Sequence, residues 1–166
     1  YTQLARMQEF KYTIALPAPT LYGQFNNLDD IDYVLTGLKE MGFDMVFEVS
    51  RAAELVSEAT RKLMDAGKLK RPVISSACPA VVRLIRVRFP DLVDNVLPLK
   101  SPMETAAAMA KRQAHEETGL PYEDIGCFFI TPCPAKVTDM KAPIGLEKSM
   151  VDGALAISDV FPMLSH

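Results

Sequence analysis

Short apolar runs alternate along this sequence with longer segments whose apolar residues recur at helical spacing. Runs at 12–16, 45–49 and 72–76 each precede such a segment, and two further runs lie at 126–130 and 151–157. Short runs bounded by Pro or Gly are typical of strands, whereas a spacing of three and four is typical of amphipathic helices. The alternation therefore predicts βαβ units with parallel strands and right-handed crossovers.

The segments between the runs carry start and stop signals of helices. Ser101 is a good N-cap, Pro follows it at the first helical position, and Glu104 completes a capping box. Asn27 and Ser50 are the expected caps of two earlier helices, and Gly42 suits the left-handed residue that ends the first of them. We expect helices at about 28–41, 50–67, 79–89 and 101–119, and a short one that begins near Ser158.

The predicted strands are apolar on both faces, which a sheet covered by helices on both sides requires. We therefore expect an α/β fold with a parallel or mostly parallel sheet and helices on both faces. The length of 166 residues favours one domain, which spans residues 1–166. Because the chain begins at Tyr1 rather than Met, we expect it to be a fragment of a longer chain.

Composition excludes several classes of protein. Hydrophobic residues make up 49% and charged residues 23%, which argues against disorder. A net charge of −3 does not indicate a partner nucleic acid. No apolar run approaches the roughly 18 residues that a membrane helix needs. Three cysteines without a secretory signal favour a reducing cytoplasm over a disulfide framework.

Two cysteines lie where ligands bind in parallel sheets, beyond the carboxyl ends of predicted strands. Cys78 and Cys133 are each followed by a proline that can start a helix. A thiol at a helix N-terminus faces unpaired N–H groups and the positive end of the helix dipole, and both favour the thiolate that attacks or binds metal. The alternative is that each thiol is a small buried hydrophobe, which is the common state of a free cysteine.

The surrounding residues leave the chemistry open. Lys136 could hold an anionic ligand or be a solvated surface lysine, and Asp139 could relay protons or only pair with Lys136. Cys127 lies inside a strand, where we expect core packing. Two thiolates do not close an iron–sulfur or structural zinc site, so any further metal ligands lie outside this chain.

Three segments resemble the C-terminal region of the large subunit of iron-only (di-iron) hydrogenases and their hydrogenase-like relatives. The family has an Ala-Pro-Ser turn after its first strand, and this chain has Ala-Pro-Thr at 18–20. The family motif Thr-Ser-Cys-Cys-Pro is similar to Ser-Ser-Ala-Cys-Pro at 75–79. The motif Met-Pro-Cys-x-x-Lys-x-x-Glu is similar to 131–139, which reads Thr-Pro-Cys-Pro-Ala-Lys-Val-Thr-Asp. The resemblance covers roughly residues 12–160, in order.

This resemblance implies an H-cluster site, in which a 4Fe-4S cube is joined to a di-iron unit with carbonyl and cyanide ligands. Cys78 and Cys133 would be two of the four cube ligands. Lys136, Pro19 and Thr20 would contact the cyanides. The other two family cysteines lie in a third motif that this chain lacks, so we expect a cluster in the full-length parent and not in this fragment. The resemblance also implies an electron carrier such as a ferredoxin as partner.

The departures from the family motifs bear on activity. Where the family has a proton-transfer cysteine before the first cube ligand, this chain has Ala77, and Leu97 matches a serine of the same proton path. Asp139 replaces a glutamate and Val81 a tryptophan. We therefore expect an iron–sulfur protein with a sensory or electron-transfer role and weak hydrogen turnover. The alternatives are an active hydrogenase with a modified proton path through Asp139, and a non-metallic α/β interaction or ligand-binding module.

Overall fold

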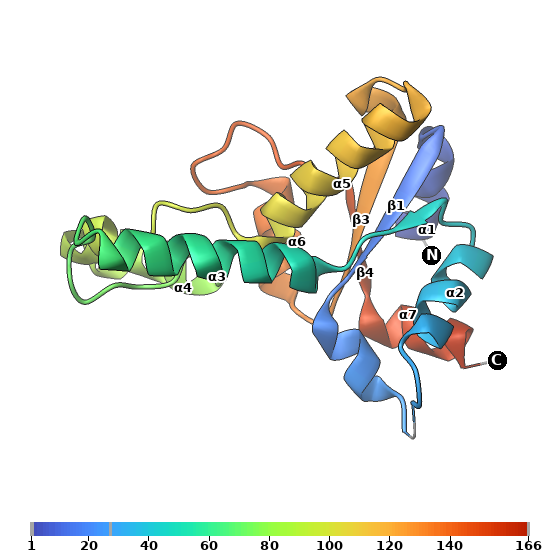
Figure 1. Ribbon diagram of the computed structural model, residues 1–166, viewed down its shortest axis with the longest axis horizontal. Coiled ribbons are helices and arrows are strands. Elements are labelled where there is room, and N and C mark those ends of the chain that lie inside the picture. The colour runs from blue at the N-terminus through green and yellow to red at the C-terminus, as the bar shows by residue number, and fades with distance from the viewer. Residues whose placement is uncertain (1, 27, 166) are drawn as a thin grey trace.

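The molecule is built on a four-stranded, all-parallel sheet with the strand order β2-β1-β3-β4. A computed structural model describes residues 2–26 and 28–165. The central strands are β1 (Tyr12–Pro17) and β3 (Ile125–Thr131), and the edges are β2 (Met45–Val46) and β4 (Gly153–Ala156) (Figure 1). Every strand therefore points its carboxyl end toward the same edge of the sheet.

Helices cover both faces of the sheet. Alternate residues of a strand face opposite sides, so Ile14 and Cys127 contribute to one core cluster while Ala15 and Phe128 contribute to the other. The first cluster packs against α5 (Pro102–Thr118) and the start of α3 (Val49–Asp65). The second packs against α2 (Asp32–Glu40) and α7 (Ile157–Leu164), with residues of α1 (Thr2–Ala5) and the 3-10 turn η1 (Arg6–Glu9) at its margin.

Alanine allows α5 to lie close to the central strands. Its buried face carries Ala106, Ala107, Ala110 and Ala114, all fully buried. Ser101 caps the helix by accepting a bond from the Glu104 amide, and Gly119 ends it with a φ of 71°. The expected capping box is incomplete, because the Glu104 carboxylate binds Ser149 and the Met150 amide instead.

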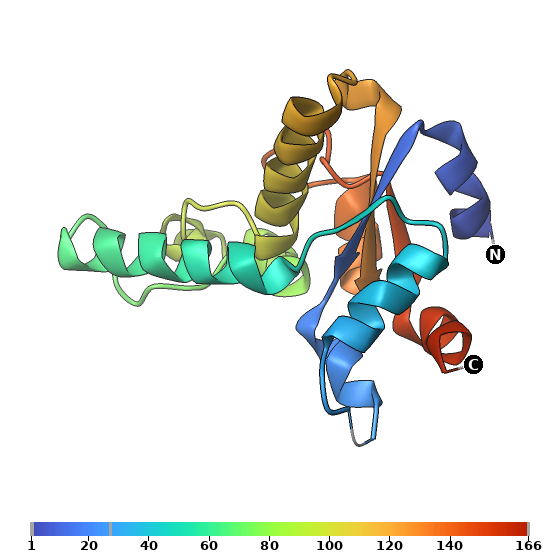
Figure 2. The same cartoon turned by 45° about the vertical axis from the view of Figure 1, so that its right-hand side comes forward.

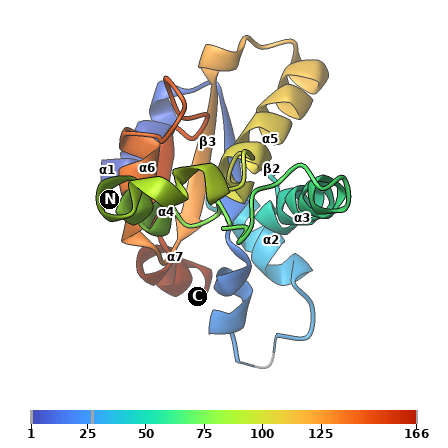
Figure 3. The same ribbon diagram turned by 90° about the vertical axis from the view of Figure 1, so that its left-hand side faces the viewer.

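An arm formed by α3, α4 (Pro79–Arg88) and the 3-10 turn η3 (Pro90–Asn95) extends to one side of the sheet (Figures 1 and 2). Viewed along this arm, α4 lies beside α6 (Pro134–Lys141) (Figure 3). Within this arm, α4 therefore packs against α6, the helix that follows β3. The two remaining 3-10 turns are η2 (Pro19–Gln24) and η4 (Tyr122–Asp124).

The fold class is confirmed, and several expected bounds are corrected. Residues 72–76 form no strand of the sheet and make only an isolated bridge between Ile74 and Val96. The second strand is shorter than 45–49, because α3 already begins at Val49. The first expected helix begins at Asp32 rather than at 28, and its expected cap, Asn27, lies outside the described residues.

The last two expected elements are also shifted. β4 is shorter than the run at 151–157, and α7 begins at Ile157 after Ala156 rather than at a Ser158 cap. No helix among residues 2–26 and 28–165 is long and apolar enough to cross a membrane.

Candidate functional site

Two cysteines occupy equivalent positions at the starts of two neighbouring helices. Cys78 is the N-cap of α4 with φ −100° and ψ 107°, and Cys133 is the N-cap of α6 with φ −105° and ψ 111°. In both helices a proline follows at the first helical position, and neither cysteine side chain bonds to its own helix. Both side chains therefore lie at the positive end of a helix dipole, beside N–H groups that have no intrahelical partner.

Different parts of the fold position the two cysteines. Cys133 follows β3 directly, as expected from the sequence. Cys78 follows the segment 72–76, which is not a strand of the sheet, so the expectation of two equivalent βα units is wrong for this cysteine. Packing of α4 against α6 places Cys78 instead.

A lysine side chain joins the two cysteine segments. The Lys136 ammonium, on the first turns of α6, donates a 2.6 Å hydrogen bond to the carbonyl oxygen of Ala77. Burial lowers the pKa of Lys136, and the neighbouring charges of Asp139, Cys133, Cys78 and Glu104 act in the opposite direction. The ammonium is therefore surrounded by groups that are anionic when ionised, and it is not a solvated surface lysine.

The three thiols differ in accessibility. Cys78 is exposed and Cys133 is half-buried, whereas Cys127 is fully buried in β3. Burial raises the pKa of the Cys127 thiol, whose Sγ lies 3.9 Å from the carbonyl oxygen of Ala107. The expectation that Cys127 packs in the core is confirmed, and two thiols remain for ligand binding.

Protein ligands for a closed metal site are incomplete in this part of the chain. The described residues include no group of three or more His, Cys, Asp or Glu side chains that could hold a metal ion. Cys78 and Cys133 have the donor chemistry that iron–sulfur clusters need, and each presents a thiol outside the core. They fit half of a four-thiolate set.

The turn that follows β1 lies at the same edge of the sheet. Pro19 and Thr20 open η2 and are exposed. The Ala18 amide donates to the carbonyl oxygen of Ile130, so this turn is bonded to β3 three residues before Cys133. The Tyr22 hydroxyl donates a 3.0 Å bond to Glu48, which ties the turn to the start of α3.

Asp139 lies on the inner side of α6 and is only 6% exposed. Its side chain lines a cavity rather than an ion pair with Lys136. Leu97 lines the same cavity, so the position matched to a family serine is apolar here. Ala77 is half-buried between Ser76 and Cys78 and offers the site only backbone groups.

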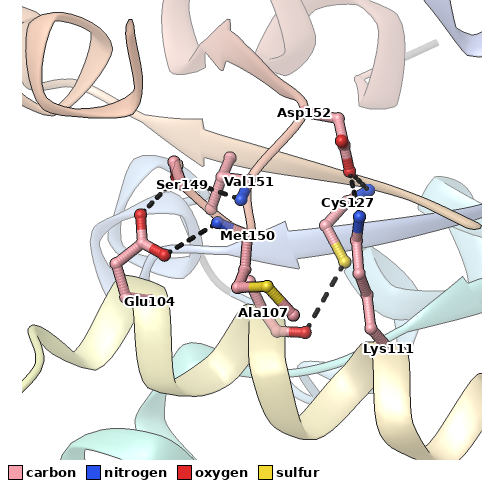
Figure 4. Close-up of polar contacts among 8 residues, drawn as sticks. All are labelled: Glu104, Ala107, Lys111, Cys127, Ser149, Met150, Val151 and Asp152. Carbon is pink, nitrogen blue, oxygen red and sulfur yellow. Dashed lines mark hydrogen bonds and ion pairs between the residues drawn. The ribbon is translucent and has the colours of Figure 1, made fainter. Parts of the chain in front are cut away.

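Sequence reasoning missed a buried polar network behind the site. Glu104, 3% exposed, accepts bonds from the Ser149 hydroxyl and the Met150 amide (Figure 4). Two turns along α5, the Lys111 ammonium lies 2.7 Å from the Asp152 carboxylate, which also accepts from the Cys127 amide (Figure 4). The sequence does contain a signal for this network, because Glu104 and Lys111 lie on the same helical face of α5 as its buried alanines.

This network fixes the segment that returns from α6 to β4. Glu104 holds it at Ser149 and Met150, and Lys111 holds it at Asp152. The Asp152 amide also donates to the carbonyl oxygen of Cys127. The network therefore couples α5 to the segment that leads from the cavity wall beside Asp139 into β4.

Comparison with known proteins identifies the family. The sequence model of "Iron only hydrogenase large subunit, C-terminal domain" matches residues 11–166. The NADP-reducing hydrogenase subunit HndD of Solidesulfovibrio fructosivorans is 32% identical over 115 residues, which are 64% of this chain and 20% of that protein. Iron hydrogenase 1 of Clostridium pasteurianum is 23% identical over 145 residues, which are 80% of this chain and 25% of that protein.

Solved structures agree in fold. An apo FeFe-hydrogenase HydA1 from Chlamydomonas reinhardtii superposes with a TM-score of 0.78 at 23% identity, over 99% of this chain and 46% of that one. The chain thus spans less than half of that structure and a quarter or less of the two curated relatives.

Proposed function

Because this chain belongs to the family defined by the C-terminal domain of the iron-only hydrogenase large subunit, we propose that it is one lobe of a hydrogenase-like iron–sulfur protein. Cys78 and Cys133 supply two of the four thiolates of a 4Fe-4S cluster in the full-length parent. The observation that carries this proposal is the matched pair of N-caps, with nearly equal backbone angles, on helices that pack together.

The local chemistry supports thiolate ligation at both positions. Each cysteine is followed by a helix whose first N–H groups lack intrahelical partners, and the Lys136 ammonium adds positive charge beside both. Iron binds the thiolate form of cysteine, and a positive environment suits that bound thiolate. Cys127 has the opposite environment and serves as the matched control.

Lys136, Pro19 and Thr20 are the proposed contacts of a di-iron unit. A bound H-cluster supplies the redox chemistry that interconverts protons, electrons and hydrogen. Lys136 offers the Nζ protons that its bond to Ala77 leaves free, and the turn at Pro19 and Thr20 lies at the carboxyl end of β1. These residues orient and hold an anionic ligand.

The proposed role is sensory or electron-transferring, with weak hydrogen turnover. A positioned acid or base contributes typically 10²–10⁴-fold to a rate. Ala77 and Leu97 have no exchangeable side-chain proton, so two links of the family's proton path are absent. Electrons would be exchanged with a carrier such as a ferredoxin in the cytoplasm.

A second candidate function is an active hydrogenase with a modified proton path. The buried Asp139 carboxylate, next to a cavity and one turn from Lys136, favours this alternative. The third candidate is a non-metallic interaction or ligand-binding module, and the exposure of Cys78 is compatible with it.

Anaerobic reconstitution of the full-length protein with iron and sulfide tests the cluster. We expect broad visible absorbance that is lost or strongly reduced in Cys78→Ala and Cys133→Ala and is retained in Cys127→Ala. Absorbance unchanged in the first two variants would contradict the proposal and favour the non-metallic module.

Turnover of the matured full-length protein separates the first two functions. We expect slow hydrogen evolution that increases by about one to two orders of magnitude in the double variant Ala77→Cys with Leu97→Ser, because both proton carriers are restored. Rapid evolution by the unmodified protein would contradict the sensory role. If Asp139→Asn then left that rapid rate unchanged, Asp139 would be excluded from the path of an active hydrogenase.

A further inference from the structure

A cavity of about 550 Å³ lies between the later turns of α4 and the segment that follows α6. Three cationic side chains line it: Arg83 and Arg86 from α4, and Lys141 from the end of α6. The loop at 142–147 completes the wall. The cavity does not include Cys78 or Cys133, because each cysteine stands at the opposite end of its helix.

The positive charge on this wall is not neutralised by ion pairs. Within residues 2–26 and 28–165, Arg83, Arg86 and Lys141 pair with no carboxylate. An acidic residue, Glu147, lines the same cavity, but it is exposed and pairs with none of the three. The chain as a whole carries a net charge of −3, so this excess of cations is a local feature. A cleft lined mainly by one sign of charge attracts ions of the opposite sign.

Arg83 carries a buried donor that has no acceptor. Its Nη2 donates to the carbonyl oxygen of Ala142, which holds the guanidinium at the end of α6. Its Nε–H is buried and has no hydrogen-bond partner in the part of the chain that the structure describes. A buried N–H group of a charged side chain is costly when it lacks a partner. An acceptor beside this guanidinium would remove that cost.

The loop in the wall supplies further donors. Gly145 has a φ of 75°, a left-handed conformation that favours glycine. The amides of Ile144 and Gly145 donate to no acceptor among the described residues. Successive backbone N–H groups in a turn form a concave arrangement that binds anions. The cavity therefore combines side-chain and backbone donors that the protein itself leaves without acceptors.

The size and the apolar part of the cavity indicate an organic anion. Val87, Ile144 and Leu146 line it beside the cations. Its volume lies within the range of about 300–1,000 Å³ that is typical of small-molecule sites, and it exceeds what inorganic phosphate fills. Arg83 and Arg86 are one turn apart on the same helical face. A guanidinium matches two phosphate oxygens at once, and two guanidiniums with one ammonium suit a dianion better than a single carboxylate.

We propose that this cavity binds the phosphate monoester of a small organic molecule. The phosphate oxygens accept hydrogen bonds from the Arg83 and Arg86 guanidiniums and from the Lys141 ammonium. A small rotation of the Arg83 side chain lets its Nε donate as well. The organic part of the ligand lies against the apolar residues of the wall. This is a binding step only, in which no covalent bond of the ligand forms or breaks.

A ligand in this cavity would hold α4 and the end of α6 together. These two helices begin at Cys78 and Cys133, so the ligand would stabilise the packing that places both cysteines. Arg86 lies eight residues after Cys78, which is about 12 Å along a helix. The binding site therefore needs no cluster, and the inference does not rest on the proposed function.

Titration calorimetry of the full-length, metal-free protein with phenyl phosphate tests the site. We expect saturable binding that weakens about tenfold or more in Arg86→Gln, which removes a charged donor, and in Arg83→Lys, which keeps the charge but loses the planar fork. Arg88→Gln is the matched control, because Arg88 is an exposed residue of the same helix and does not line the cavity. Its affinity should stay within about twofold of the unmodified protein. Equal weakening in Arg86→Gln and Arg88→Gln, or no binding of phenyl phosphate, would overturn the proposal.

Two further measurements test the ligand class and the place of binding. Inorganic phosphate and citrate should each bind more weakly than phenyl phosphate, and equal or tighter binding of either would overturn the assignment to an organic phosphate. Acetylation of Lys141 by acetic anhydride, followed by peptide mass spectrometry, should slow when phenyl phosphate saturates the protein, whereas acetylation of the exposed Lys68 should not. Unchanged acetylation of Lys141 would overturn this location. None of these results bears on cluster ligation, which the visible absorbance of Cys78→Ala and Cys133→Ala decides separately.

Discussion

The Lys136 ammonium donates a hydrogen bond to the carbonyl oxygen of Ala77 across 59 positions of sequence. This bond crosses from the helix that Cys133 begins to the residue that precedes Cys78. A charged donor and a peptide carbonyl make a stronger bond than two neutral groups. The relative placement of the two cysteine segments therefore depends in part on one lysine side chain.

The first prediction concerns pH. Burial lowers the pKa of Lys136 from 10.5, so between its folded-state pKa and 10.5 the unfolded chain binds more protons than the folded protein. Stability rises with pH wherever that is true. The free energy of unfolding should rise with pH over this range relative to Lys136→Met, measured by urea denaturation at several pH values. A difference between the two proteins that stays constant with pH would contradict the prediction.

The second prediction is an order of thiol reactivity. In the metal-free protein, iodoacetamide should modify Cys78 first and Cys133 more slowly, and it should leave Cys127 unmodified. The reason is that Cys127 is fully buried and its thiol pKa is raised by burial. Peptide mass spectrometry measures each rate, and all three thiols should react in urea. Modification of Cys127 at the rate of Cys133 would contradict this order, and reconstitution with iron and sulfide should protect the other two.

The third prediction concerns the buried ion pair of Lys111 and Asp152, whose side chains are 8% and 11% exposed. Lys111→Met leaves a buried carboxylate without its cation and should cost about 3–5 kcal/mol of unfolding free energy. Adding Asp152→Asn should recover part of that loss. Lys62→Met, which breaks the exposed pair with Glu58, is the control and should have no measurable effect. A cost for Lys111→Met no larger than that of the control would contradict the prediction.

The fourth prediction concerns the loop that Glu104 holds. Glu104→Ala removes the acceptor of the Ser149 hydroxyl and the Met150 amide. We expect hydrogen exchange at Met150 to accelerate at least tenfold, because each bond to a charged group contributes about 1.5–3 kcal/mol. Glu116→Ala, on the exposed side of α5, should not change it. Unchanged exchange at Met150 would show that the loop is held by other contacts.

Local sequence signals, such as prolines, helix caps and apolar runs, correctly predicted three of the elements. β3 and α4 have the expected bounds to within a residue, because Pro79 and Pro90 delimit α4 and unbroken apolar residues mark β3. α5 agrees equally well, since Ser101 and Gly119 act as its caps. In these three elements the conformation that the local sequence favours is also the one that the tertiary packing requires.

The segment at 72–76 shows where local signals fail. Its apolar residues resemble those of β1, but a strand also needs a partner along its whole length, and the partner is chosen by tertiary packing. Here Asn95 occupies the region by donating to the carbonyl oxygen of Pro72, and only Ile74 forms a bridge. The sequence therefore indicated an extended segment correctly and its membership of the sheet wrongly.

The candidate site, too, was predicted only in part from local sequence signals. The repeated Cys-Pro pair predicted both helix starts, because a cap and its proline are adjacent in sequence. The bonds of Glu104 to Ser149 and of Lys136 to Ala77 join residues 45 and 59 positions apart. No local pattern specifies such partners, so these contacts become visible only once the helices are placed.

The pairing of the two central strands determines when the site can form. β1 and β3 lie side by side although Lys11 and Asp124, which bond at their start, are 113 positions apart. Contacts between such distant segments are slow to form during folding. Cys133 stands just beyond β3, and Cys78 is held near it by the packing of α4 against α6 and by the bond of Lys136 to Ala77. In an unfolded chain neither contact is formed, so the two thiols that are proposed to share a cluster come together only in the folded protein.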